Sequence, residues 1–165
     1  MNKQEILDEI NKTKEHLANM EKMLEECEQG RWKPKDGEKF FFIDAWNRVC
    51  DKNYKEINIC CREYYDIFNC FKTREEAEQE AEKILIRRQL EDIARRLNKG
   101  QEIDWNNAVQ NKYFICSNHW QNTIILEHGW KNKCCGVIYC LDKNFLNVAI
   151  QEIGEERLKK YLRGE

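Results

Sequence analysis

The segment from Thr73 to Asn98 constrains the fold more than any other, because it predicts one long helix near the middle of the chain. Thr73 and Glu76 have the spacing of a capping box, in which each side chain bonds a backbone N–H left open at the helix start. Apolar residues recur through the segment with the helical period. They are Ala77, Ala81, Ile84, Leu85, Leu90, Ile93, Ala94 and Leu97. Gly100 follows where a left-handed C-terminal cap is expected. At about 1.5 Å per residue, this helix spans roughly 39 Å.

The composition excludes several classes of protein. A chain of 165 residues fits one domain, or two small units that share a core. With 28 basic and 30 acidic residues the net charge is −2, so there is no global attraction to nucleic acid or anionic membranes. No apolar run approaches the length of a membrane span, and the charged N-terminus lacks a signal-peptide core. We therefore expect no membrane partner and a cytoplasmic location.

The spacing of apolar residues in 3–28 predicts an amphipathic helix with a heptad seam. The seam residues are Ile6, Ile10, Thr13, Leu17, Met20, Leu24 and Cys27. Such a helix can pack on the protein's own core, form an intramolecular helix pair, or form a coiled coil between two chains that makes a homodimer. Three heptads are short for an isolated coiled coil, so we expect the helix to contact something else as well.

Aromatic and alternating stretches on both sides of the long helix predict strands. The candidates are 39–43, 46–49, 54–61 and 64–71 before the helix, and 113–115, 120–126 and 133–139 after it. The residues 51–53 between them are expected to form a turn, and so is Gly129. The two stretches resemble each other, because Trp32 precedes Lys39 by seven residues and Trp105 precedes Lys112 by seven. Internal similarity of this kind indicates a duplicated unit, although aromatic strands and capped helices can also look alike by chance.

We therefore predict an α+β fold with three parts. Residues 1–30 form the N-terminal amphipathic, coiled-coil helix. Residues 31–100 form a first β-rich unit with the long helix, and residues 101–165 form a second, similar β-rich unit with C-terminal helices. Both units are expected to be βββα-like, with antiparallel strands packed on long helices. Gly154 is expected to break the final helix, so that Glu155 begins a last short one.

Two segments carry a resemblance to a group of known proteins. The segment 68–77 reads FNCFKTREEA, and the segment 149–162 reads AIQEIGEERLKKYL. Residues 31–163 resemble small phage and prophage accessory proteins, which share a Trp-x-Pro connector, an NCFKT-like helix start and a terminal IGEE-LKKYL helix. The second unit departs from that pattern at residues 141–143, which replace the usual aromatic-serine start. The resemblance carries no catalytic motif. It implies an accessory phage protein, a group in which inhibitors of host defence are common.

The cysteines and histidines are the residues that could form a metal site or a catalytic site. The chain has nine cysteines, an odd number that favours reduced thiols where no signal peptide is present. Seven are candidate zinc ligands: Cys60, Cys61, Cys70, Cys116, Cys134, Cys135 and Cys140. None forms the C-x(2–4)-C knuckle of a structural zinc site, and the two members of an adjacent pair on a strand point to opposite faces. We expect core cysteines, no metal and no cofactor.

A catalytic role is the least expected reading of the histidines. His16 is expected to face solvent. Cys116 could pair with His119 or His128 as nucleophile and base, but no nucleophile signature surrounds them. No glycine-rich phosphate loop and no framed pair of carboxylates is present either. The sequence therefore predicts a protein that is not an enzyme.

The candidate binding residues are aromatic and basic. Trp46, Trp120 and Trp130 lie in or beside the expected hairpins, and His119 adjoins Trp120. Aromatic side chains are enriched in binding hot spots and can stack on bases, although core packing is the simpler explanation. Arg88 and Arg95 are seven residues apart and share one face of the long helix. They could contact an anion, or pair with Glu91 and Asp92 on a solvated face.

The function predicted from these features is inhibition of a host antiviral defence factor, such as a CRISPR-type nuclease, by stoichiometric protein binding. An inhibitor of this kind needs a stable scaffold and an exposed surface but no catalytic residues. Two alternatives stay open. The protein could sequester a nucleotide signal in a pocket between the two copies or between protomers, in which Trp and Arg side chains hold base and phosphate. It could also bind nucleic acid directly, which the charge balance disfavours.

Overall fold

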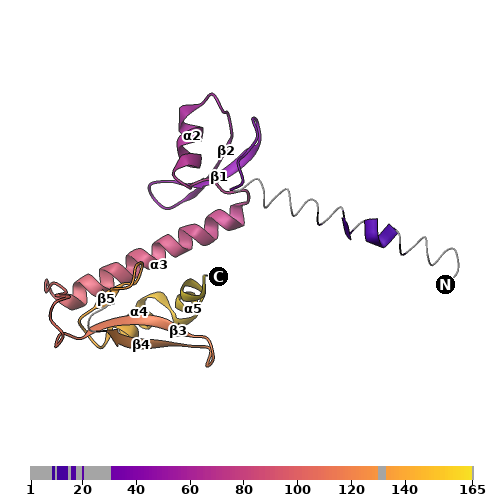
Figure 1. The fold of residues 1–165 in the computed structure, drawn as a ribbon. Helices are drawn as coiled ribbons and strands as arrows, with labels where there is room; N and C mark the ends of the chain where they lie inside the picture. Colours follow the sequence, from indigo (N-terminus) through magenta and orange to yellow (C-terminus); the bar gives the residue numbers. More distant parts are fainter. Residues whose placement is uncertain are drawn as a thin grey trace. The chain divides into compact units, whose positions relative to one another are not determined.

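The computed structural model describes residues 9, 11–14, 16, 17, 20, 31–129 and 133–164 (Figure 1). These residues contain both helices and strands, and the strands form two small antiparallel sheets. The elements are β1 (Lys39–Ile43), β2 (Val49–Asn53), α2 (Ile59–Asp66), α3 (Arg74–Asn98), β3 (Lys112–Asn118), β4 (Thr123–Gly129), β5 (Tyr139–Cys140), α4 (Phe145–Ile153) and α5 (Glu155–Arg163). The mixed α and β composition predicted from the sequence is confirmed.

Only part of the predicted N-terminal seam falls within the described residues. Ile6, Ile10 and Leu24 lie outside them. The described positions between 9 and 20 are helical, and the side chains of Leu17 and Met20 are more than half exposed. His16 is exposed, as the sequence predicts.

Residue contacts divide the chain into two compact units. One comprises Met1–Phe42 with Cys50–Arg74, and the other comprises Ile43–Val49 with Glu75–Glu165. The sequence-based boundaries at residues 30 and 100 stay predictions. They group α3 with the first β-rich region, whereas its contacts from Glu75 onward lie in the second unit.

Aromatic rings build the core of the first unit. The buried residues of this core are Phe40, Tyr54, Cys61 and Cys70. Phe42 stacks on Tyr64 of α2 with ring centroids 4.3 Å apart, and Phe40 meets Tyr54 edge-on at 6.0 Å. Such pairs add about 0.5–1.5 kcal/mol to the stabilisation that area burial provides, which matters in a core this small.

The predicted strands 54–61 and 64–71 are wrong, because α2 occupies the middle of this stretch and no strand of the described residues lies within it. Asn58 is the N-cap of α2, and its side-chain oxygen accepts a hydrogen bond from the backbone N–H of Cys61 at 3.4 Å. Cys61, Tyr64 and Tyr65 then have the i, i+3, i+4 spacing that places side chains on one helix face, and that face packs into the aromatic core. The strand β2, which pairs with β1, instead includes residues 51–53, where the sequence predicts a turn. Within 64–71, only Phe71 pairs with β1, in a bridge to Phe41.

The long helix is confirmed as α3. Its buried residues are Ala77, Ala81, Ile86, Leu90, Ile93 and Ala94. Leu85, one of the apolar residues of the predicted helical period, is exposed, whereas Ile86 is buried. The predicted left-handed cap is present, because Gly100 has a φ of +81° after Lys99 at +51°.

The second unit packs a three-stranded sheet against helices. The strand order is β4-β3-β5, with Ile115 opposite Leu126 and Tyr113 opposite Cys140. One face of the sheet contributes Ile115 and Ile124 to a cluster with residues of α3, α4 and α5. The predicted strand at 120–126 begins at residue 123 instead and runs to Gly129, which had been expected in a turn. The predicted strand at 133–139 is reduced to residues 139–140. Gly154 separates α4 from α5 with a φ of +97°, as predicted.

A fully buried lysine holds the loop that covers the other face of this sheet. The Lys112 Nζ donates to the carbonyl oxygens of Asn107 at 2.9 Å and Gln110 at 2.8 Å. It also lies 5.5 Å from the ring centroid of Trp105, and that ring packs edge-on against Tyr139 at 4.9 Å. A buried ammonium is costly unless its donors are used, so Lys112 stabilises this one loop conformation.

We expect the substitution Lys112→Ala to destabilise the protein by about 3 kcal/mol, because it empties the site and leaves two buried carbonyls unpaired. Lys39 is the matched control, since it occupies the corresponding position in the first unit but forms an exposed ion pair with Asp51 at 3.0 Å. Lys39→Ala should cost less than about 1 kcal/mol. Urea denaturation followed by circular dichroism measures both, and equal losses would contradict the role given to Lys112.

Candidate functional site: two hairpin tips

The tip of the β1–β2 hairpin presents Trp46 on a turn held by Asp44. One carboxylate oxygen of Asp44 accepts from the backbone N–H groups of Trp46 and Arg48, both at 2.9 Å. The Arg48 guanidinium donates to the other oxygen at 2.8 Å and lies 4.9 Å from the Trp46 ring centroid. Asn47 takes a left-handed φ of +63°, and its side chain donates to the Ala81 carbonyl at 2.9 Å. The Trp46 side chain remains 76% exposed.

The tip of the β3–β4 hairpin presents Trp120 in the same way. The Asn118 side-chain oxygen accepts from the backbone N–H groups of Trp120 at 3.1 Å and Gln121 at 3.2 Å. Asn122 follows with a left-handed φ of +55°, and its side chain accepts from the Arg163 guanidinium. The Trp120 side chain is 99% exposed. His119 next to it is exposed as well.

The two tips therefore share one construction. An Asp or Asn side chain bonds the backbone N–H two residues on, which is the geometry of an Asx-turn, and the indole belongs to that second residue. An indole buries 150–250 Å² on binding, so at 25 cal/mol per Å² each tip can supply roughly 4–6 kcal/mol before the costs of association. A turn that is already ordered loses little backbone entropy when it binds. The tips are suited to insertion into an apolar pocket.

The basic candidates on α3 are not part of this site. Arg95 and Arg96 both pair with Asp92, the latter at 2.9 Å, and Arg96 also reaches Glu152 at 2.6 Å. Hydrogen bonds from these two arginines hold the pKa of Asp92 below its usual value. Arg88 is exposed. These pairings fit the solvated helix face that was the alternative reading of the sequence.

The predicted binding residues do not form one cluster. Among the described residues, no hydrogen bond, ion pair or ring contact joins Arg88 or Arg95 to the tips at Trp46 and Trp120. Trp130 lies outside the described residues. Sequence reasoning identified both tip tryptophans but missed Asp44 and Asn118, although the spacings Asp-x-Trp and Asn-x-Trp are visible in the sequence.

The described cysteines are thiols that differ widely in burial. Cys61, Cys70 and Cys140 are buried, whereas Cys60, Cys134 and Cys135 are exposed. The expectation of core cysteines therefore holds for only some of them, since residues 60–61 belong to a helix rather than a strand and residues 134–135 lie at a turn. Burial raises the pKa of Cys70 to about 11 and also raises that of Cys140. Such thiols are poor nucleophiles.

The sheet register separates the residues of one conceivable catalytic dyad. Cys116 lies opposite Ile125, and His128 lies opposite Tyr113, so the two side chains belong to opposite faces of the sheet. Burial raises the pKa of the Cys116 thiol. His119 is exposed at the hairpin tip. Within the described ranges, no three His, Cys, Asp or Glu side chains are grouped to hold a metal ion.

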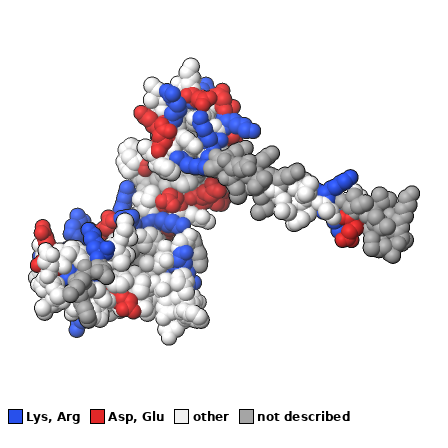
Figure 2. Space-filling view, in the orientation of Figure 1, with Lys and Arg blue, Asp and Glu red and all other residues white. Residues whose placement is uncertain are grey.

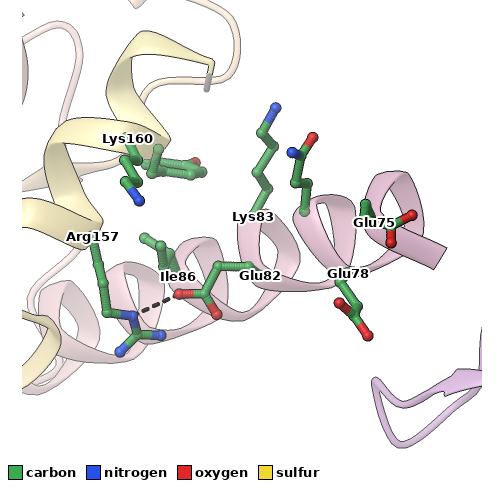
Figure 3. A pocket seen from close by; sticks show the side chains of 9 residues that line it. Glu75, Glu78, Glu82, Lys83, Ile86, Arg157 and Lys160 are labelled. Atoms are coloured by element: carbon green, nitrogen blue, oxygen red, sulfur yellow. Dashed lines mark hydrogen bonds and ion pairs between the residues drawn. The ribbon is translucent and has the colours of Figure 1, made fainter. Parts of the chain in front are cut away.

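A groove between α3 and α5 was not predicted from the sequence (Figure 3). Its cavity of about 660 Å³ is of ligand size. The lining residues are Glu75, Glu78, Gln79, Glu82, Lys83, Ile86, Arg157, Lys160 and Tyr161. Glu82 accepts from the Arg157 guanidinium at 2.6 Å, and the Lys83 ammonium donates to the Gly164 carbonyl at 2.9 Å. The lining has three glutamates and three basic side chains, so its formal charges cancel. The only sequence signal is the helical spacing of the three glutamates.

No family model, no curated protein and no solved structure matches this chain. None of the helices in the described part of the chain is long and apolar enough to cross a membrane. The function is therefore inferred from the geometry of the described residues, and the two tips are the strongest candidate site.

The two tips should respond differently to acid. Burial by itself would raise the pKa of Asp44, but the N–H groups of Arg48 and Trp46 and the Arg48 guanidinium outweigh it, so this pKa lies below its usual value. A carboxyl with a depressed pKa stabilises the fold above its unfolded value, near 4, and loses that effect as the pH falls through its folded value. The Trp46 tip should therefore loosen below about pH 4, whereas Asn118 does not titrate.

Two-dimensional NMR of the indole N–H signals between pH 6 and pH 2 measures this difference. We expect the Trp46 signal to shift before the Trp120 signal, which should move only when the whole chain unfolds. The substitution Asp44→Asn should remove the early shift. Simultaneous movement of both signals in the unsubstituted protein would contradict the role of the Asp44 carboxylate.

Proposed function

We propose that the protein is a non-enzymatic binding protein that blocks a host antiviral defence factor, such as a CRISPR-type nuclease, by stoichiometric protein binding. The observation that carries this proposal is the presence of two hairpin tips that each present an exposed tryptophan on a turn fixed by side-chain hydrogen bonds. Tryptophan is among the residues most enriched in binding hot spots. A large apolar side chain that contacts little of its own chain, on a preorganised turn, is suited to a partner's pocket.

The choice of a host defence factor rests on the resemblance to phage accessory proteins at residues 68–77 and 149–162. A protein that acts on such a factor would work in the cytoplasm of the host cell. The exposed tips and the resemblance support the same function, because an inhibitor that acts by steric exclusion requires a binding surface and no reaction chemistry.

Binding of nucleic acid is supported less well. Exposed indoles can stack on bases, but such proteins also need a basic groove that follows the backbone. On the face drawn in Figure 2, basic and acidic side chains are intermixed. Arg87 pairs with Glu91 at 3.1 Å, and Arg96 pairs with two carboxylates.

Sequestration of a nucleotide is the second candidate, and the groove between α3 and α5 is the observation that favours it. Arg157, Lys160 and Tyr161 could contact phosphate and base. The same groove contains three glutamates, and a carboxylate close to a phosphate is repulsive. Protein binding through the tips is therefore the function that we prefer.

We further propose that residues 31–100 and residues 101–165 are copies of one βββα-like unit. In each unit the first strand of the hairpin pairs on its other edge with a later residue, Phe41 with Phe71 and Phe114 with Tyr139. In the chain, each pairing is followed by a helix, α3 after Phe71 and α4 after Tyr139. The first copy has α2 inserted and retains only a single bridge in place of its third strand.

We expect Trp46→Ala and Trp120→Ala each to weaken binding of the target by at least about 2 kcal/mol, or roughly 30-fold in Kd, because each removes a hot-spot indole. The target is first captured from lysate of a host with expressed defence systems and identified by mass spectrometry. Affinity is then measured by calorimetry with the purified target, together with protection of phage in a plaque assay.

Val109→Ala is the control for this experiment, because Val109 is an exposed apolar residue away from both tips. It should bind as tightly as the unsubstituted protein. The proposal fails if both tryptophan variants still bind and protect, or if no stoichiometric partner is captured from cells whose defence the protein demonstrably blocks.

The exposed side chains of Leu17 and Met20 support a proposed homodimer through the N-terminal helix. Glu9 and Lys14 occupy flanking positions that would face each other in a parallel pair, with opposite charge. The Thr13 hydroxyl donates to the Glu9 carbonyl at 2.8 Å, so a polar residue in the seam has its donor satisfied.

The substitution Leu17→Asp should convert this dimer to a monomer, because it places a charge in the seam. Light scattering after size exclusion should give about twice the 20.0 kDa chain mass for the unsubstituted protein. Lys12→Ala, on the outer face of the helix, should leave that mass unchanged. A monomeric unsubstituted chain would remove the homodimer proposal without affecting the tips.

A further inference from the structure

The turn that ends α2 contains a strained and exposed phenylalanine. Phe68 has a φ of +64°, in the left-handed region where a bulky side chain is an outlier. Its backbone N–H donates to the Tyr65 carbonyl at 3.1 Å, and that of Asn69 donates to the Tyr64 carbonyl at 2.9 Å, so Phe68 stands where helices commonly place glycine. Its side chain is nevertheless 75% exposed, and the preceding Ile67 is 66% exposed. Burial therefore provides little compensation for the strain.

An arginine packs against this ring. The Arg31 guanidinium carbon lies 4.3 Å from the ring centroids of both Tyr65 and Phe68. Its Nη2 atom is buried and has no hydrogen-bond partner. In the part of the chain that the structure describes, no carboxylate pairs with Arg31, whereas Lys33 close by is paired with Glu56 at 2.9 Å. The turn thus combines two exposed apolar side chains with a cation that has no counter-charge among the described residues.

We propose that the Ile67–Phe68 turn is a second protein-docking site, separate from the hairpin tips. Its ligand is a peptide segment that presents an aliphatic or aromatic side chain beside a carboxylate. The apolar side chain packs on the Phe68 ring, and the carboxylate supplies the counter-charge that none of the described residues gives Arg31. Strained residues that persist on a surface occur preferentially at binding sites, and this strain lies in the residue that would make the central contact. The proposal goes beyond the defence-factor hypothesis, because it requires only a peptide of this chemistry.

The probe is a random peptide library displayed on phage and selected on the immobilised full-length protein. We expect the enriched peptides to contain an apolar residue within a few positions of Asp or Glu. Synthetic versions of these peptides are then titrated into the protein by fluorescence anisotropy. Phe68→Asn should weaken binding at least 10-fold, since asparagine tolerates the left-handed backbone but lacks the ring. Arg31→Gln should weaken binding and reduce its dependence on salt, which screens a charge pair.

Lys99→Asn is the matched control, because Lys99 also has a left-handed φ, of +51°, and is exposed. It should bind the peptides within 2-fold of the unsubstituted protein, as should Trp46→Ala and Trp120→Ala. The proposal is overturned if no such peptide is enriched, or if Phe68→Asn binds as tightly as the original. It is also overturned if Phe68→Asn lowers the Tm by more than about 4 °C, since the ring would then be a structural element. If the protein binds the peptides but captures no host factor, the proposed inhibition of a defence factor is wrong and this docking site still stands.

Discussion

Hydrogen bonds that backbone N–H groups donate to short polar side chains fix the turns on which the rest of this structure depends. Asp44 and Asn118 form the two hairpin tips, and Asn58 begins α2. Asp104 and Asn107 order the loop that Lys112 then holds against the sheet. The chain has one proline and seven glycines, so its turns are specified by side-chain acceptors more than by restricted or permissive backbones. Because Asp44 and Asn118 fix the backbone of the tips, the side chains of Trp46 and Trp120 are not needed to form the turns.

The two units solve the problem of burying apolar surface differently. The first unit is small and relies on aromatic rings, with Phe40 and Tyr54 at its centre. The second unit has a larger aliphatic cluster, to which α3 contributes Ile86, Leu90 and Ile93. A small domain has too little interior to be stable from burial alone, and ring pairs with defined geometry add to that stability. The exposed Ile67 and Phe68 at the end of α2 belong to the first unit, which has the smaller core.

The sequence predicted those features whose signals are local and repeated. The helix α3 carries a cap signal and six turns of periodic apolar residues, and the first strands of both hairpins are marked by aromatic runs. The strand prediction for residues 54–71 is wrong because the alternation of polar and apolar residues there is short. The eight-residue helix α2 depends instead on the Asn58 cap and on the packing of Cys61, Tyr64 and Tyr65 into the aromatic core. Trp46 and Trp120 could be named from the sequence. The groove between α3 and α5 could not, because it exists only after two distant helices pack.

The exposed indoles of the two tips also make the tryptophan fluorescence of the protein sensitive to binding. Trp32 and Trp105 are partly buried against other rings, whereas Trp46 and Trp120 project into water. Indole emission moves to shorter wavelength when water is removed from around the ring. A partner that encloses either tip would therefore change the colour of the protein's own fluorescence, and the chain could report its occupancy without any attached label.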